Sequence, residues 1–306
     1  MTHNYTENPI PGKMPDKMLP KGCALVLEGG GTRGFYSAGV FDAFMAAGIM
    51  FPYIAGVSAG AANALSYIAG QPGRNRQIVE KYVGNPKYVS IRNLLFHRSM
   101  FGMKFIFHEV PQKHIFIDWD MFNKQDITFL TGAFDCDTGQ TIWFNKNDIT
   151  HNLEVTMASC SVPLISSIFN YRGYKLLDGG IADPIPIEKS VSDGNTFHVI
   201  VLTRNEGYIK PSFKYKHLFK MVYKKYPKMI EMIFNRHVIY NRQLAFCEQL
   251  EREGRAIIIR PLKPLQFGDS TGRDIKKLLD LYDEGFEEAK EKIDVLSELS
   301  QQFIQN

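Results

Sequence analysis

The chain of 306 residues is long enough to bury the core of one large α/β domain or of two smaller ones. Its 44% hydrophobic and 22% charged residues are typical of a globular protein, and a net charge of +4 is too small to indicate a nucleic-acid partner. No apolar run reaches the ~18 residues of a membrane span, and four scattered cysteines without a C-x-x-C pair argue against a zinc site. We therefore expect a cytoplasmic protein that contacts membranes, if at all, only peripherally.

Short apolar segments alternate with helical patterns along most of the chain. We predict a polar N-terminal arm over residues 1–20, a sheet-containing core over 21–205, and a mainly helical part over 206–306 that packs on the same domain. The predicted strands lie at residues 23–28, 53–58, 126–135, 140–145, 174–180, 197–203 and 255–261. Helices are predicted from Gly34 to Gly48 and over 59–69. This alternation predicts an α/β fold whose sheet is mostly parallel, with an antiparallel pair near the middle.

The first predicted strand is followed by a glycine-rich loop. Gly29, Gly31 and Gly34 satisfy G-x-G-x-x-G, a pattern typical of dinucleotide-binding loops. Such a site also needs an acidic residue about 20 positions later to bind the ribose. No acidic residue lies between Gly48 and Ile78, so we expect no dinucleotide cofactor.

A G-x-S-x-G motif occupies the place of the missing acid. Gly56, Ser58 and Gly60 follow a predicted strand and precede a helix, the context of a nucleophile elbow that exposes a serine hydroxyl. The alternative is that Ser58 only caps the helix. Three consecutive glycines, Gly29 to Gly31, offer unobstructed backbone N–H groups, and Arg33 adds a positive charge. The loop can therefore stabilise the oxyanion of an acyl intermediate.

The serine also needs a base. Asp178 ends a predicted strand and is followed by Gly179 and Gly180, so its carboxylate could take the Ser58 proton directly; a simple turn is the alternative. The histidines that follow Asp178 lie in a strand or in helical stretches, where a catalytic histidine is not expected: His198, His217 and His237. A metal site at the loosely grouped His97, His108 and His114 is not expected either.

Together these motifs resemble the bacterial patatin-like phospholipases over about residues 21–205. The family's motifs are the loop Gly29-Gly30-Gly31-Thr32-Arg33-Gly34, the elbow around Ser58, and Asp178-Gly179-Gly180. The segment "MASCSVPLISS", upstream of Asp178, also resembles the family. The resemblance implies a three-layer α/β/α sandwich and a Ser58–Asp178 dyad that needs neither metal nor cofactor. It also implies that the N–H groups of Gly30 and Gly31, joined by that of Ala59, hold the oxyanion, with Arg33 supporting the loop.

The resemblance implies a serine lipid acyl hydrolase, of phospholipase A or lysophospholipase type, acting on phospholipids or other fatty acyl esters. A thioesterase or acyltransferase with the same dyad, or a non-catalytic lipid-binding protein, remains open, as does the oligomeric state. Within 214–226, the side chains of Tyr215, Leu218, Phe219, Val222 and Tyr226 share one face of a predicted lysine-flanked helix. This face either contacts an anionic membrane or packs on the sheet. A Met- and Phe-rich helix predicted over 98–107 either lines an acyl pocket, covers it as a lid, or packs in the core.

Overall fold

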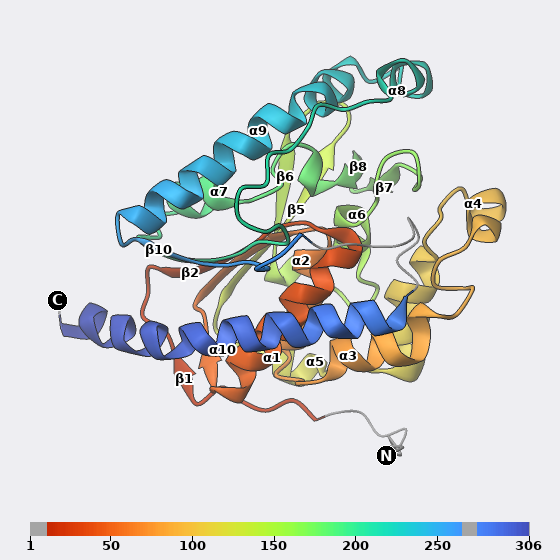
Figure 1. Ribbon diagram of the computed structural model, residues 1–306. Helices are drawn as coiled ribbons and strands as arrows, with labels where there is room; N and C mark the ends of the chain where they lie inside the picture. Colours follow the sequence, from red (N-terminus) through yellow and green to blue (C-terminus); the bar gives the residue numbers. More distant parts are fainter. Residues whose placement is uncertain (1–10, 265–273, 306) are drawn as a thin grey trace.

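The computed structural model describes residues 11–264 and 274–305 and has an eight-stranded sheet between two layers of helices (Figure 1). The strand order is β10-β9-β2-β4-β5-β8-β7, with β6 also paired to β5. A separate pair, β1 (Lys17–Met18) and β3 (Ile49–Met50), anchors the described part of the N-terminal arm; residues 1–10 lie outside the description. The strands of the main sheet are β2 (Cys23–Leu27), β4 (Tyr53–Val57), β5 (Thr128–Asp135), β6 (Thr141–Asn145), β7 (Phe169–Tyr171), β8 (Tyr174–Asp178), β9 (Phe197–Val201) and β10 (Ala256–Ile259).

The sheet is mostly parallel, as predicted. Strands β10, β9, β2, β4 and β5 pair in parallel, whereas β6 and β8 pair antiparallel with β5, and β7 pairs antiparallel with β8. The predicted hairpin of β5 and β6 is confirmed. The antiparallel part is larger than predicted, because β8 reverses direction beside β5 and the unpredicted strand β7 continues it.

Helices cover both faces of the sheet, which confirms the three-layer prediction. Helices α1 (Phe35–Ala46), α2 (Ala59–Ile68) and α10 (Ile275–Gln305) cover one face; α7 (Ile187–Ser192) and α9 (Pro227–Arg252) cover the other (Figure 1). Alternate β2 side chains reach opposite cores: Leu25 and Leu27 pack with α1, whereas Val26 packs with α9. Both faces are buried, so the parallel strands are continuously apolar. The remaining helical segments are η1 (Gly31–Gly34), α3 (Arg74–Ile78), η2 (Val79–Val83), α4 (Ile91–His97), η3 (Phe105–His114), α5 (Trp119–Lys124), η4 (Lys146–Asp148), α6 (Glu154–Ser159), η5 (Gly179–Ile181) and α8 (Lys216–Val222).

Two predicted helices differ from the observed ones. Residues 98–102 form no helix, and a π-helical segment, η3, begins at Phe105. Helix α8 ends at Val222, and the predicted apolar stripe within 214–226 is divided. Phe219 is buried against α9, whereas Leu218 and Val222 remain exposed, because Phe219 packs in a cluster with Met229 and Ile233. Within the described residues, no helix combines the length and apolarity that crossing a bilayer requires.

Helices α1 and α10 approach each other closely through two glycines. A side chain at Gly39 would collide with the carbonyl oxygen of Tyr282, and one at Gly285 would collide with that of Tyr36. The Tyr282 hydroxyl donates to the buried Asp42 carboxylate, and burial raises the pKa of Asp42 to about 6. The long C-terminal helix therefore packs backbone to backbone against the core.

Alanine at either glycine should destabilise the protein. Gly39→Ala and Gly285→Ala should each lower the free energy of unfolding by about 1–3 kcal/mol, because the added methyl group meets backbone that cannot rotate away. Urea unfolding followed by circular dichroism measures the loss. The control is Glu287→Ala, which changes an exposed residue of α10 two positions after Gly285. If both glycine variants match this control, the close approach is not a stabilising contact.

Candidate active site

Ser58 lies on a strained turn between β4 and α2. Its backbone angles are φ 52° and ψ −131°, a region that non-glycine residues rarely adopt. The first turn of α2 packs tightly beneath it, because a Cβ at Gly60 would lie 2.7 Å from the carbonyl oxygen of Glu28. Gly56 likewise lies close to the backbone of Ala61. This is the strand–turn–helix geometry of a nucleophile elbow.

The structure brings Asp178 to Ser58 across 120 positions of sequence. The Ser58 hydroxyl donates to Asp178 Oδ2 at 2.6 Å, and both side chains are buried. Strand register explains the meeting. Val57, just before Ser58, is paired with Gly132 of β5, while Asp178 is paired with the next residue of β5, Ala133. Ser58 and Asp178 therefore lie at one level of the sheet, on either side of β5.

Several groups act on the protonation of Asp178. Burial raises its pKa above the ordinary range; hydrogen bonding to the Ser58 hydroxyl, the charge of Arg236 and the N–H of Gly180 oppose that rise. The Gly180 N–H donates to Asp178 Oδ1 at 2.8 Å. Arg236, on α9, donates through Nε to the carbonyl oxygen of Gly180. Gly179 packs on β5, where a side chain would meet the carbonyl of Gly132. The buried carboxylate is thus held by hydrogen bonds to both of its oxygens.

Ser159 holds the backbone of the elbow. Its hydroxyl accepts from the N–H of Ser58 at 2.8 Å and donates to the carbonyl oxygen of Gly132 at 2.6 Å. The Ser58 N–H is therefore already bonded. Only the family resemblance points to the segment before Asp178, and nothing in its local pattern assigns this contact to Ser159.

The glycine loop lies next to the elbow. Gly34 packs on α2, where a Cβ would lie 2.5 Å from that of Ala59, and its carbonyl oxygen accepts from Asn63 at 2.7 Å. Gly31 has φ +56° and open space where a side chain would be. The Gly29 N–H donates to Pro184 at 3.2 Å, but the N–H groups of Gly30 and Gly31 bond no acceptor in the described part of the chain. Two donors are thus free at the end of the loop.

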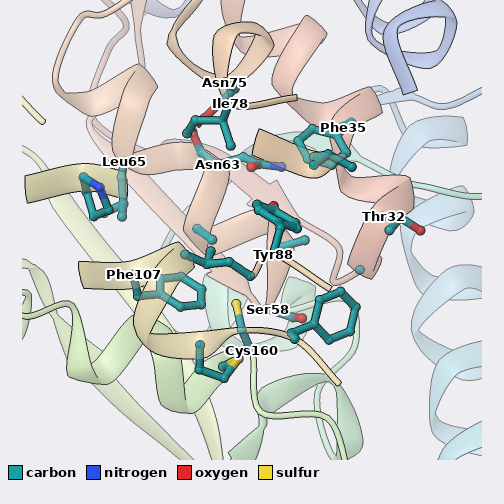
Figure 2. A pocket seen from close by; sticks show the side chains of 18 of the residues that line it. Thr32, Phe35, Ser58, Asn63, Leu65, Asn75, Ile78, Tyr88, Phe107 and Cys160 are labelled. Carbon is teal, nitrogen blue, oxygen red and sulfur yellow. Dashed lines mark hydrogen bonds between the residues drawn. The ribbon is translucent and has the colours of Figure 1, made fainter. Parts of the chain in front are cut away.

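An apolar cavity opens at Ser58 and Gly31. Figure 2 shows Phe35, Tyr88 and Phe107 around it, with Cys160 beside Ser58. Phe101, Met103, Ile106 and Phe107 line its wall, so the Met- and Phe-rich segment does border a pocket although it is not one helix. The loop residues Gly31 and Thr32 line the cavity. The Arg33 side chain instead lies near Glu28, Tyr208 and Tyr240, where burial and then repulsion from Arg204 lower the pKa of Arg33.

The histidines considered as alternative bases lie elsewhere. His198 is fully buried within β9, where its Nδ1 is 3.2 Å from Ser190 Oγ, and burial lowers its pKa to about 4. His217 is exposed on α8, and His237 lies on α9. Over residues 11–264 and 274–305, no histidine bonds to Ser58 or Asp178, and no group of three or more potential metal ligands is found.

Comparison with known proteins places the chain in a family. A family model described as "Patatin-like phospholipase" matches residues 25–190, just over half of the sequence. The chain belongs to the patatin-like phospholipase family. A second model, for a domain of unknown function, matches residues 226–301 of this patatin-like chain.

Two similar proteins extend the comparison. The uncharacterized protein YjjU of Escherichia coli is 26% identical over 262 residues, covering 80% of this chain and 70% of that protein. The crystal structure of VipD from Legionella pneumophila superposes with a TM-score of 0.54 at 13% identity, covering 90% of this chain and 67% of that one. The likeness to VipD supports the patatin-like fold.

The contact of Arg236 predicts a change in pH dependence. Only an ionised Asp178 can accept a proton, and Arg236→Gln removes a charge that lowers the pKa of Asp178. Labelling of Ser58 by a fluorophosphonate should then begin at higher pH than in the unaltered protein. Arg242→Gln is the control, since Arg242 lies on the same helix but pairs with Glu188 at 3.0 Å. Superimposable pH profiles for all three proteins would exclude this electrostatic role.

Proposed function

We propose that this patatin-like protein hydrolyses carboxylic esters of lipids through an acyl-enzyme on Ser58, with Asp178 as the base. The observation that carries the proposal is the 2.6 Å hydrogen bond from the Ser58 hydroxyl to the buried Asp178 carboxylate, beside an apolar cavity. The strained elbow supports it, because strain of this kind is concentrated at functional residues.

The proposed reaction has two steps. Ser58 Oγ attacks the ester carbonyl as Asp178 takes its proton, and the N–H groups of Gly30 and Gly31, with that of Ala59, hold the resulting oxyanion. Collapse of the intermediate expels the alcohol, which receives the proton from Asp178. Asp178 then takes a proton from the water that attacks the acyl-enzyme. Collapse of this second intermediate releases the fatty acid, and Asp178 returns the proton to the leaving Ser58 Oγ.

The cavity supports a fatty acyl chain as the acid portion of the ester. Its wall is predominantly apolar, with aromatic and branched side chains such as Phe35, Ile78 and Phe107. An acyl chain there would have its carbonyl carbon at Ser58. The substrates proposed are therefore phospholipids or lysophospholipids, which the family description also supports.

Two substitutions test the dyad. Ser58→Ala should abolish fluorophosphonate labelling and lower hydrolysis of p-nitrophenyl butyrate by about a thousandfold or more, and Asp178→Asn should impair turnover to a similar extent. His217→Ala and His237→Ala are controls and should retain most of the activity. Unchanged turnover by Ser58→Ala would falsify the mechanism, and a histidine variant as impaired as Asp178→Asn would replace the dyad by a triad.

We further propose that the protein reaches lipid through a surface made by α4 and α8. Helix α4 exposes Ile91, Leu95 and Phe96, with exposed fractions of 66%, 74% and 72%. Helix α8 similarly exposes Leu218 and Met221. The loop 161–168 connects the ends of the two helices. The N–H of Met100, which follows α4, donates to the carbonyl oxygen of Ile165, and the N–H of Leu164 donates to the hydroxyl oxygen of Tyr223, which follows α8.

Charge supports an anionic membrane as the partner of this α4–α8 surface. Residues 84–108 contain four Lys/Arg and residues 207–230 contain seven, and neither segment contains Asp or Glu. Exposed apolar side chains flanked by cations are typical of proteins that bind anionic bilayer surfaces. Val162, in the joining loop, also lines the cavity at Ser58, so the surface adjoins the site.

Single leucine substitutions test this surface. With Ser58→Ala as background, Leu95→Ser and Leu218→Ser should each weaken binding to vesicles containing phosphatidylglycerol by about tenfold, because each removes an apolar group that would leave water. Vesicle sedimentation measures the change. Leu262→Ser is the control, since Leu262 is 73% exposed but lies outside the α4–α8 surface. Equal losses for all three variants would contradict a specific docking surface.

A further inference from the structure

Four cationic side chains gather beside the dyad, on the side of α9. Arg33 belongs to η1, Arg204 and Lys210 follow β9, and Arg236 belongs to α9. We call these four residues the cation cluster. Two tyrosines hold it in place: the Arg204 guanidinium lies 4.3 Å from the ring centre of Tyr208, and Lys210 Nζ lies 4.9 Å from that of Tyr240. The two rings pack edge to face at 5.8 Å.

The positive charge of the cluster is incompletely balanced. In the described part of the chain, none of its four members forms an ion pair within 4.0 Å. The nearby carboxylate of Glu28 already accepts from the Tyr240 hydroxyl at 3.0 Å and from the Thr203 N–H at 2.5 Å. Burial, and then repulsion within the cluster led by Arg236, lowers the pKa of Lys210 to about 7. An anion would relieve this repulsion.

Hydrogen-bonding groups next to the cluster are also available. Arg33 Nε and Thr203 Oγ1 are buried and have no partner among the described residues. Thr203 lies against the oxyanion loop, because a Cβ at Gly30 would be 2.9 Å from its hydroxyl oxygen. An anion with several oxygens could accept from more than one of these donors at once, which favours a phosphate over a single-point anion.

The cluster lies across the dyad from the acyl cavity. The cavity is lined from η1, α2, α3 and η3, whereas the cluster combines Arg33 of η1 with side chains of α9 and of the segment after β9. Helices α2 and α9 cover opposite faces of the sheet (Figure 1). Arg236 connects the cluster to the dyad through Gly180, which also bonds Asp178. An ester with its acyl chain in the cavity would direct its alcohol portion toward the cluster.

We propose that Arg33, Arg204, Lys210 and Arg236 form a phosphate-binding subsite that receives the phosphate of the substrate's alcohol portion. Its role toward a lipid rests on the proposed function; its affinity for phosphate does not. Arg236 and Tyr240 lie in the segment 226–301 matched by the domain of unknown function. The C-terminal segment therefore contributes side chains to the proposed substrate site as well as packing on the core.

Selectivity measures the subsite on a lipid. Monomeric dihexanoyl phosphatidylcholine and dihexanoylglycerol carry the same acyl chains, and only the first has a phosphate. In Lys210→Met and Arg204→Gln, the ratio of kcat/KM for the phospholipid to that for the glyceride should fall by about tenfold, the loss expected for one charge-assisted hydrogen bond. Lys124→Met and Arg252→Gln neutralise exposed cations away from the cluster and should keep the ratio of the unaltered enzyme.

Direct binding separates this inference from the hydrolase mechanism. Inorganic phosphate should raise the Tm of the Ser58→Ala protein. In the double variant Ser58→Ala with Lys210→Met most of this Tm shift should be lost, whereas the control double variant Ser58→Ala with Lys124→Met should retain it. Binding of inorganic phosphate without a change in lipid selectivity would keep the subsite but assign it to free phosphate. If neither the Tm shift nor the selectivity responds to Lys210→Met and Arg204→Gln, the subsite does not exist. If phosphate raises the Tm in this way but the protein with Ser58 intact has no esterase activity, the proposed function is contradicted and the subsite is not.

Discussion

The buried hydrogen bond between Ser58 and Asp178 is the interaction on which the rest of the site depends. Ser58 follows β4 and Asp178 is the last residue of β8, and these two strands lie on either side of β5. They meet because β8 runs antiparallel to β5 in the register that places Asp178 opposite Ala133. Gly132 of β5 contributes through its backbone: its carbonyl oxygen accepts the Ser159 hydroxyl, and a side chain at Gly179 would collide with that oxygen. A shift of β8 by one residue would turn the carboxylate to the other face of the sheet.

The C-terminal third of the chain participates in this arrangement. Helix α9 supplies Arg236, which bonds the Gly180 carbonyl and opposes the rise in the pKa of Asp178, and Tyr240, which bonds the buried Glu28. Glu28 in turn bonds the N–H of Thr203, so the end of β2 is tied both to α9 and to the segment after β9. Helix α10 covers α1 on the opposite face. The segments 25–190 and 226–301 matched by two family models therefore share one sheet and one site.

Much of the candidate site was predictable because it depends on local backbone requirements. The strained turn at Ser58 requires small neighbouring residues, and the loop that exposes backbone N–H donors requires glycines. Both requirements can be recognised in the sequence as short glycine-containing motifs. Ser159 and Arg236 were not predicted to act as they do, since their partners, Gly132 and Gly180, become neighbours only when the sheet and α9 assemble. The face predicted within 214–226 was partly wrong for the same reason. Periodicity places Phe219 with Leu218, but packing against α9 buries the first and leaves the second exposed.

The sequence by itself determined the α/β class, the mostly parallel sheet and the identity of the serine and aspartate motifs, because these follow from apolar periodicity and from glycines at strained or crowded turns. Tertiary structure alone decided which groups surround the motifs. It placed the apolar cavity on the α2 face of the sheet, the cation cluster on the α9 face, and the exposed apolar side chains of α4 and α8 on either side of one loop. The physical reason is that side-chain charge and burial act through space, between segments whose separation along the chain carries no information about their distance in the fold.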